Sequence, residues 1–184
     1  MAVTWSRIAR RIRVPLGFAF AALYLWLARP TPAFMALSLI LVLPGIWLRA
    51  YASGYVKKNT ELTVTGPYAF TRNPLYLGSM LIAFGFALAS RSIWIALALV
   101  ALFANIYIPV IRSEEAFLRS KFDDFDAYAA RVPRLLPRLT PARSLKSERG
   151  AFSRDLYRKH REYNALMGAV AIYAALALRI YFWG

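Results

Sequence analysis

The chain has 184 residues, of which 59% are hydrophobic and only 18% are charged, and its formal net charge is +15. A water-soluble domain of this length would carry more charge and fewer long apolar runs, so the composition predicts a membrane protein. Cysteine is absent and histidine occurs once, which excludes disulfides, thiolate metal sites and multi-histidine metal centres.

Five apolar runs follow one another along the chain, and we interpret each as a membrane-spanning helix. They cover residues 14–28, 33–55, 75–89, 93–111 and 165–183. A spanning helix needs about 20 residues, with about 17 as a lower bound, so the first and third runs depend on semi-polar flanks for their full length. The third run begins after Pro74, which suits the first turn of a helix because an N–H there has no helical partner.

Lysine and arginine are unevenly distributed around these runs. Of the 24 such residues, only Arg29, Arg91 and Arg179 lie on one side of the predicted membrane, which leaves 24 − 3 = 21 on the other. The positive-inside rule therefore predicts a cytoplasmic N-terminus and an external C-terminus. The basic excess is thus a topology signal, assisted by anionic membrane lipids, and it argues against a nucleic-acid partner.

The first of two polar segments is Gly66–Gly78, GPYAFTRNPLYLG. It contains a Gly66-Pro67 turn and two aromatic residues, and Arg72-Asn73 then leads into the third helix. The free N–H groups at the start of that helix favour an anion. A pocket here could stack an adenine on an aromatic ring and hold a carboxylate. A membrane-entry loop with interfacial tyrosines is the alternative interpretation.

The second polar segment begins with residues 112–130, RSEEAFLRSKFDDFDAYAA. A ragged apolar stripe predicts an amphipathic helix at the membrane surface, broken near Asp123-Asp124. Glu114 and Glu115 lie at its beginning, close to the bilayer, where a carboxylate needs a partner or water and is a functional candidate. A solvated helix start with simple ion pairs explains the two acids equally well.

Residues 131–137, RVPRLLP, contain two prolines and predict an extended strap, which could close over a ligand or simply link to the fifth helix. The predicted fold is an all-α integral membrane protein with about five transmembrane helices.

Because the third and fourth helices form a hairpin, both polar segments emerge on the same side of the membrane. We expect them to form a cytoplasmic cofactor pocket. We divide the chain into N-terminal helices (1–53), a core (54–138) and a linker with the last helix (139–184).

Taken together, these segments resemble the isoprenylcysteine carboxyl methyltransferase family and its relatives, the phospholipid N-methyltransferases and bacterial members of unknown substrate. The resemblance covers about residues 54–138. It rests on GPYAFTRNPLYLG, the helical hairpin, the EE-x-x-L and F-x-x-x-x-x-Y patterns and RVPRLLP, in this order. It implies an enzyme of the bacterial inner membrane that uses S-adenosylmethionine and releases S-adenosylhomocysteine.

The resemblance also implies roles for individual residues. The implied cofactor contacts fall on Leu62, Thr63, Tyr68, Asn73, Pro74, Leu75, Tyr76 and Glu114. Arg112 and Glu115 are the candidate catalytic residues, with Glu115 as the base for an ammonium acceptor. Asn73 stands where the family has histidine, so proton transfer at this position is lost. Val110 stands where members that methylate carboxylates have arginine, which counts against a prenylcysteine carboxylate.

Methyl transfer from a sulfonium needs positioning and a dry pocket more than acid–base catalysis. The leading hypothesis is methyl transfer to a lipophilic small molecule or lipid, through a carboxylate, thiol or amine, with the acceptor entering from the bilayer. A membrane reductase of the sterol-reductase type and a non-catalytic scaffold or accessory protein are the alternatives. The small number of spans counts against the reductase, and the oligomeric state stays open.

Overall fold

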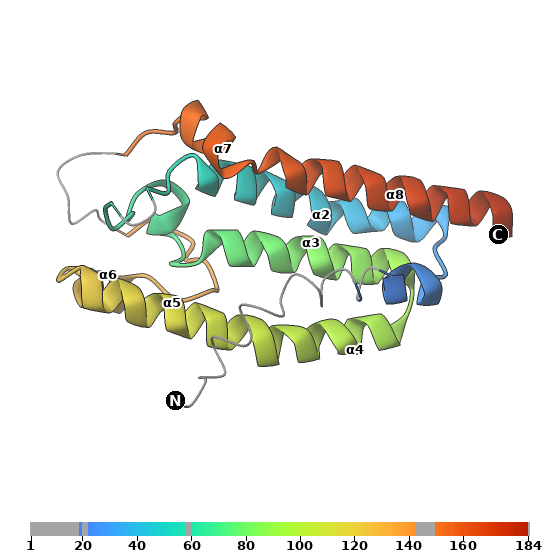
Figure 1. Cartoon of the computed structure of the whole chain (residues 1–184), viewed down its shortest axis with the longest axis horizontal. Helices are drawn as coiled ribbons and strands as arrows, with labels where there is room; N and C mark the ends of the chain where they lie inside the picture. Colours follow the sequence, from blue (N-terminus) through green and yellow to red (C-terminus); the bar gives the residue numbers. More distant parts are fainter. Residues whose placement is uncertain (1–18, 20–21, 58–59, 143–149, 184) are drawn as a thin grey trace. The chain divides into compact units, whose positions relative to one another are not determined.

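The computed structural model describes residue 19 and residues 22–57, 60–142 and 150–183 (Figure 1). Helices are the only regular secondary structure of these residues, which confirms the all-α prediction. The α-helices are α2 (Pro32–Ser53), α3 (Pro74–Ser90), α4 (Ile93–Leu102), α5 (Ile108–Lys121), α6 (Phe125–Arg131), α7 (Arg154–His160) and α8 (Tyr163–Trp183). A 3-10 helix, η1 (Gly66–Ala69), precedes α3, and a π-helical turn, η2 (Phe103–Tyr107), joins α4 to α5.

Three helices in the described part of the chain are long and apolar enough to cross a membrane. They are Pro32–Ser53, the continuous helix Ile93–Lys121 and Tyr163–Phe182, which match the second, fourth and fifth predicted spans. α3 is apolar but has only 17 residues, at the lower bound for a span. Most of the first predicted span, 14–28, lies outside the described residues, although residues 22–27 are helical. The count of five spans therefore stays a prediction.

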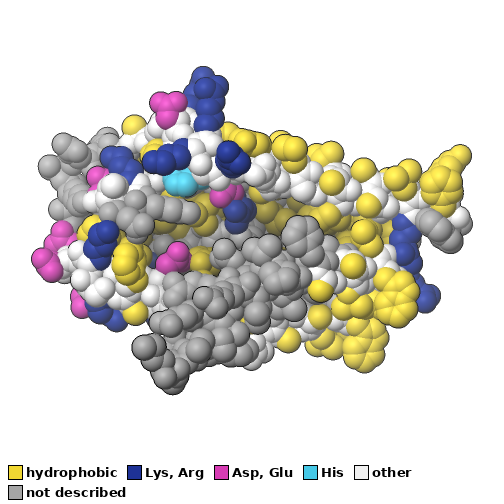
Figure 2. Space-filling view, in the orientation of Figure 1, with side chains coloured by type: hydrophobic (Ala, Val, Ile, Leu, Met, Phe, Trp, Pro, Cys, Tyr) yellow, Lys and Arg dark blue, Asp and Glu magenta, His cyan; other side chains and the backbone are white. Residues whose placement is uncertain are grey.

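Large apolar side chains on these helices are exposed. They include Leu43 and Trp47 on α2, Trp94 and Leu97 on α4, and Val170 and Leu178 on α8. On the face drawn in Figure 2, hydrophobic side chains cover the length of α8, and charged side chains gather over α6 and α7. Exposed apolar residues in this number are expected where lipid, not water, surrounds a helix.

The chain divides into two compact units. The first comprises residues 1–42, 82–114 and 168–184, and the second comprises residues 43–81 and 115–167. The helices α2, α3, α5 and α8 each pass from one unit into the other. The second unit also contains η1, α6 and α7, together with most of the predicted site residues.

Buried aromatic rings and an arginine hold the first unit together. The Tyr24 hydroxyl donates a hydrogen bond to the carbonyl of Phe86 at 2.9 Å, and the rings of Phe86 and Tyr173 lie 5.0 Å apart. The Arg179 guanidinium donates to two carbonyls near the end of the helical residues 22–27. These are carbonyls for which a helix end has no internal partner, so Arg179 has a structural role.

In the second unit, the segment before α3 turns sharply at Gly66. This glycine has a φ of +59°, and a Cβ atom there would lie 2.6 Å from the ring of Tyr55. Both the backbone conformation and the space therefore require glycine. Pro67 follows in the first turn of η1, which confirms the predicted Gly66-Pro67 turn.

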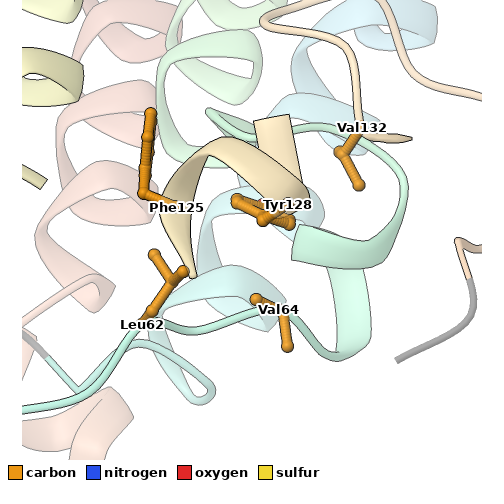
Figure 3. Close-up of a cluster of buried hydrophobic side chains, with 5 residues drawn as sticks. All are labelled: Leu62, Val64, Phe125, Tyr128 and Val132. Carbon is orange, nitrogen blue, oxygen red and sulfur yellow. The ribbon is translucent and has the colours of Figure 1, made fainter. Parts of the chain in front are cut away.

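A small apolar core joins α6 to the segment before η1 (Figure 3). Its buried members are Leu62, Val64, Phe125, Tyr128 and Val132. The helix is interrupted at residues 122–124, which confirms the predicted break near Asp123-Asp124 and allows α6 to leave the direction of α5. The Tyr128 hydroxyl donates to the carbonyl of Tyr68 at 2.8 Å. This core fixes the loop before α3 against the chain that follows α5.

Candidate functional site

The polar site of the second unit is built around the carboxylate of Glu115, a residue only 6% exposed. Its Oε1 accepts a hydrogen bond from Asn73 Nδ2 at 3.2 Å, and its Oε2 accepts one from Arg134 Nε at 2.9 Å. Arg72 Nε lies 3.4 Å from Oε1. A buried charge needs such partners, because leaving it unpaired away from water is costly. We refer to Glu115, Arg72, Asn73 and Arg134 as the Glu115 cluster.

Three segments that are distant in the sequence supply this cluster. Arg72 and Asn73 end the loop before α3, Glu115 lies on α5, and Arg134 lies in the strap after α6. Asn73 Nδ2 also donates to the carbonyl of Arg134 at 2.9 Å, so one amide joins the strap and α5. The loop before α3 and the helix α5, which were predicted to form one site, are therefore in direct contact through side chains.

The strap, residues 131–137, is hydrogen-bonded to the loop before α3. The backbone N–H of Arg72 donates to the carbonyl of Pro133 at 2.9 Å. The Thr71 hydroxyl donates to the carbonyl of Leu135 at 3.0 Å. The extended backbone forced by the two prolines leaves these carbonyls free to accept. The strap is thus a wall of the site and more than a link to the last helix.

The Glu115 cluster carries one excess positive charge, because two guanidinium groups face a single carboxylate. In addition, the buried Nε of Arg72 lies 3.4 Å from Glu115 Oε1 in an ion pair, but it makes no hydrogen bond to any of the described residues. Buried donors without a partner are rare in folded proteins, and guanidinium groups are suited to bind carboxylates. A small anionic group would meet an excess of positive charge at this cluster.

A buried tyrosine lies close to this cluster. Burial raises the pKa of the Tyr128 phenol, Arg72 lowers it by less, and Glu115 adds a smaller rise. The phenol therefore stays protonated well above its ordinary range and remains a donor to the carbonyl of Tyr68. Tyr128 thus connects the apolar core of Figure 3 to the polar site.

Several residues implied as cofactor contacts lie in or beside these structures. Leu62 belongs to the apolar core, Tyr68 is buried and receives the Tyr128 hydrogen bond, and Pro74 is fully buried in the first turn of α3. The Thr63 hydroxyl accepts a hydrogen bond from the backbone N–H of Lys57 at 3.4 Å. These positions shape the loop, so a contact of Leu62 with a cofactor would require its side chain to leave the core.

The remaining predicted residues lie on α3 and α5. Leu75 and Tyr76 are half-buried in the first turn of α3. Arg112 and Glu114 precede Glu115 on α5, and their side chains are exposed. The paired acids therefore differ: Glu115 is buried in the cluster, whereas Glu114 faces outward.

The partners of Glu115 and a second, half-buried ion pair were not predicted from the sequence. Arg49 Nη2 lies 2.8 Å from Glu162 Oε2, and the two side chains form a two-pronged contact. Arg49 Nη1 also donates to the carbonyl of Leu75 at 3.3 Å and to the Ser79 hydroxyl. A lone arginine in an apolar run was the available signal, because such a residue must find an acid or carbonyls.

An apolar cavity of about 360 Å³ lies in the same unit. It is lined by Pro44, Trp47, Leu48, Tyr51, Pro67, Phe70, Thr71, Leu77, Leu81 and Pro137. No charged residue is among them. Thr71 belongs to the cavity wall and comes directly before Arg72 in the chain. The cavity is therefore next to the Glu115 cluster, and apolar and charged surfaces meet at this point.

Comparison with known proteins places these features in a family. The phospholipid methyltransferase family matches residues 31–124, which include Arg72, Asn73 and Glu115. No solved structure matches the chain.

Two curated relatives carry names that refer to metal resistance. The chain is 40% identical over 114 residues to the nickel-cobalt-cadmium resistance protein NccN of Alcaligenes xylosoxydans xylosoxydans, covering 60% of this chain and 53% of that protein. It is 39% identical over 95 residues to the cobalt-zinc-cadmium resistance protein CzcN of Cupriavidus metallidurans, covering 52% of this chain and 43% of that protein. The chain thus spans about half the length of the curated relatives it matches.

The family match covers half of the chain and contains the loop before α3 and the start of the polar part of α5, where the Glu115 cluster forms. Three apolar helices of spanning length agree with a family of integral membrane enzymes. The chain is an integral membrane protein that belongs to the phospholipid methyltransferase family.

Proposed function

We propose that the protein transfers a methyl group from S-adenosylmethionine to a lipophilic acceptor at the cytoplasmic face of the membrane. The observation that carries this proposal is the Glu115 cluster, in which two guanidinium groups face one carboxylate beside an apolar cavity. The family membership supplies the reaction class. The distribution of lysine and arginine supports the cytoplasmic face, with the N-terminus inside and the C-terminus outside a bacterial inner membrane.

The residues present fit the cofactor. Its carboxylate would be held by the guanidinium of Arg72, which shares the single carboxylate of Glu115 with Arg134, and by the N–H groups at the start of α3. Its cationic part would be accommodated by aromatic rings such as Tyr68 and Tyr76 and by carboxylates such as Glu114. Leu62, Thr63, Asn73, Pro74 and Leu75 complete the proposed contacts. When bound, the cofactor supplies a methyl group on a sulfonium, which is an excellent leaving group.

The pairing of Glu115 favours a positioning role over proton transfer. Both of its oxygens already interact with Asn73, Arg72 or Arg134. Asn73 cannot titrate near neutral pH, so it does not move a proton either. The site therefore favours an acceptor whose nucleophile arrives without its proton, such as a carboxylate or a thiolate. For an amine acceptor, Glu115 remains the candidate base, and Arg112 remains a predicted catalytic residue.

A second role is favoured by the names of the relatives. NccN and CzcN are named for resistance to nickel, cobalt, zinc or cadmium, and the chain is about 40% identical to each over the matched residues. We propose that the methyl transfer contributes to tolerance of such metals. In cells that depend on this protein, Arg72→Ala should lower growth in cobalt or cadmium and should leave growth without metal unchanged. Equal tolerance in both strains would separate the reaction from the phenotype.

The reaction itself is tested with methyl-labelled S-adenosylmethionine and a membrane lipid extract. The wild-type protein should transfer label to organic-soluble material, and Arg72→Ala should lower the rate at least ~100-fold, as expected for loss of a positioning contact. Arg119→Ala is the matched control, because Arg119 is an exposed arginine that pairs with Asp126 and lies over the Phe125 ring, outside the Glu115 cluster. A folded wild-type protein that labels no organic-soluble product would refute the proposal.

A further inference from the structure

The apolar cavity of the second unit is unsuited to a nucleoside cofactor. Such a cofactor carries a carboxylate, an ammonium and ribose hydroxyls, each of which needs a polar partner when buried. The cavity has no charged side chain in its wall, and the hydroxyl of Thr71 already donates to the carbonyl of Leu135. The cavity can therefore bind an apolar group, and the polar parts of a ligand must lie outside it.

The cavity and the Glu115 cluster share their walls. Thr71 lines the cavity and immediately precedes Arg72 and Asn73. On the strap, Pro137 lines the cavity and comes three residues after Arg134. Both segments that hold the carboxylate of Glu115 thus also enclose the apolar space. A molecule with its apolar part in the cavity would present its polar end toward the cluster.

The aromatic side of the cavity is built from stacked rings. The rings of Trp47 and Tyr51 are stacked with their centroids 5.2 Å apart, and Phe152 stacks on Tyr51 at 6.2 Å. Phe152 in turn rests on Gly54, where a Cβ atom would lie 2.2 Å from its ring. Trp47 and Phe152 are themselves exposed, so this wall borders the surroundings of the helices. The volume of about 360 Å³ is room for one apolar chain or ring.

We propose that this cavity binds the apolar part of the methyl acceptor, and that the acceptor is a lipophile with a single compact apolar group. The proposal rests on the methyl transfer proposed above and specifies the substrate class. The cavity lies at the low end of the ~300–1,000 Å³ typical of small-molecule sites. The two acyl chains of a phospholipid, each long enough to cross half of a ~30 Å hydrocarbon core, exceed it. The acceptor is thus a single-chain or single-ring thiol or acid, and not a diacyl phospholipid.

The test measures formation of S-adenosylhomocysteine by the full chain in phosphatidylcholine nanodiscs. The probes are n-alkyl thiols, n-alkyl carboxylic acids and n-alkyl amines from hexyl to hexadecyl, and phosphatidylethanolamine. We expect turnover with a single-chain probe, with an optimum chain length, and none with phosphatidylethanolamine. Turnover with phosphatidylethanolamine alone, or with none of the probes while S-adenosylhomocysteine still binds, would overturn the proposal.

Three variants connect this turnover to the cavity. Leu77→Trp fills the cavity and should raise the KM for the single-chain probe at least ~10-fold, as expected for a lost apolar contact. Leu43→Trp is the matched control, because Leu43 lies on α2, is exposed and is not part of the cavity wall. Leu81→Ala enlarges the cavity and should shift the chain length with the fastest turnover toward longer probes. A misfolded protein could not show faster turnover of longer probes. An unchanged KM in Leu77→Trp together with an unchanged optimum in Leu81→Ala would overturn the proposal.

Binding of S-adenosylhomocysteine separates this inference from the proposed function. The cavity variants should bind it as tightly as the wild type, because the lining of the cavity is apolar and offers no charged partner to the nucleoside. If the wild type does not bind it, the proposed methyl transfer fails. If the wild type binds it and the cavity variants do not, the cavity belongs to the cofactor and the acceptor assignment fails.

Discussion

Glu114 and Glu115 are adjacent on α5 but have different surroundings. Successive residues of an α-helix point about 100° apart, so only one of two neighbouring acids can face the loop before α3. Glu115 does so and is 6% exposed, whereas Glu114 is exposed. The sequence contained two equal candidates, and the choice between them depends on which face of α5 meets Asn73.

Replacing the buried acid tests its structural role. Glu115→Gln keeps the shape and an acceptor for Asn73, but it leaves two guanidinium groups without a counter-charge. We expect the free energy of unfolding to fall by about 1–3 kcal/mol, because a buried partner is lost and Arg134 is partly exposed to water. Thermal unfolding in detergent measures this, with Glu114→Gln as the control expected to be neutral. A larger loss in Glu114→Gln would contradict the assignment.

Tyr128 makes a prediction about alkaline pH. Its folded pKa is raised by burial, so the folded state favours the protonated phenol over the phenolate. The contribution of the protonated phenol to the free energy of unfolding is complete below the unfolded-state pKa of 10.0. It is lost as the pH rises above that value. Tyr128→Phe should cost about 1 kcal/mol near neutral pH, through the lost hydrogen bond to Tyr68. Its unfolding temperature should then fall less than that of the wild type between neutral and alkaline pH. If the unfolding temperatures of the wild type and of Tyr128→Phe change equally with pH, Tyr128 does not lose its proton on unfolding.

The helices illustrate which local features the sequence determines. Pro74 begins α3 and the break near Asp123-Asp124 separates α5 from α6, as predicted, because proline position and polar interruption act locally. The helix α7 was not predicted within the polar segment. Its Ser153 side chain accepts a hydrogen bond from Leu156 N, but the helix is also held by His160, whose Nδ1 lies 3.1 Å from the Ser53 carbonyl. That second contact depends on tertiary structure.

The close approach of α2 and α3 depends on Gly78. A Cβ atom at this position would lie 2.6 Å from Arg49 Cγ and 2.8 Å from the Gly45 carbonyl oxygen. Gly78→Ala should therefore cost about 1–3 kcal/mol, because backbone has to move. Gly168→Ala is the matched control in another apolar helix, since no atom of the described residues lies within 4 Å of the new Cβ. It should be neutral or stabilise by up to ~1 kcal/mol through helix propensity. Equal unfolding temperatures for the two variants would contradict the close contact.

For the molecule as a whole, the orientation in the membrane is open to a direct test. The chain has no cysteine, so labelling of a single introduced cysteine shows on which side of the membrane that residue lies. Ser120→Cys and Ile93→Cys place thiols at exposed positions that we predict to be cytoplasmic and external, respectively. A membrane-impermeant maleimide should label Ile93→Cys in intact cells and Ser120→Cys only after permeabilisation. The reverse pattern would invert the predicted topology.

The apolar helices and the meeting of the two polar segments were predictable, because hydrophobic length and the helical hairpin determine them. The partners of Glu115 were not, since Arg134 reaches it only after the strap has paired with the loop before α3. The apolar cavity was also hidden in the sequence. Its wall combines α2, η1, α3 and the strap, and no single segment carries a pattern that marks it.

Binding of S-adenosylhomocysteine tests the central claim most directly. Isothermal titration of the nanodisc-embedded protein should show one saturable site in the wild type and in Arg119→Ala. Arg72→Ala should bind at least ~10-fold more weakly, as expected for the loss of a charge-assisted contact worth about 1.5–3 kcal/mol. If the folded wild type shows no binding, or if Arg72→Ala binds as tightly as the wild type, the Glu115 cluster is not the cofactor site.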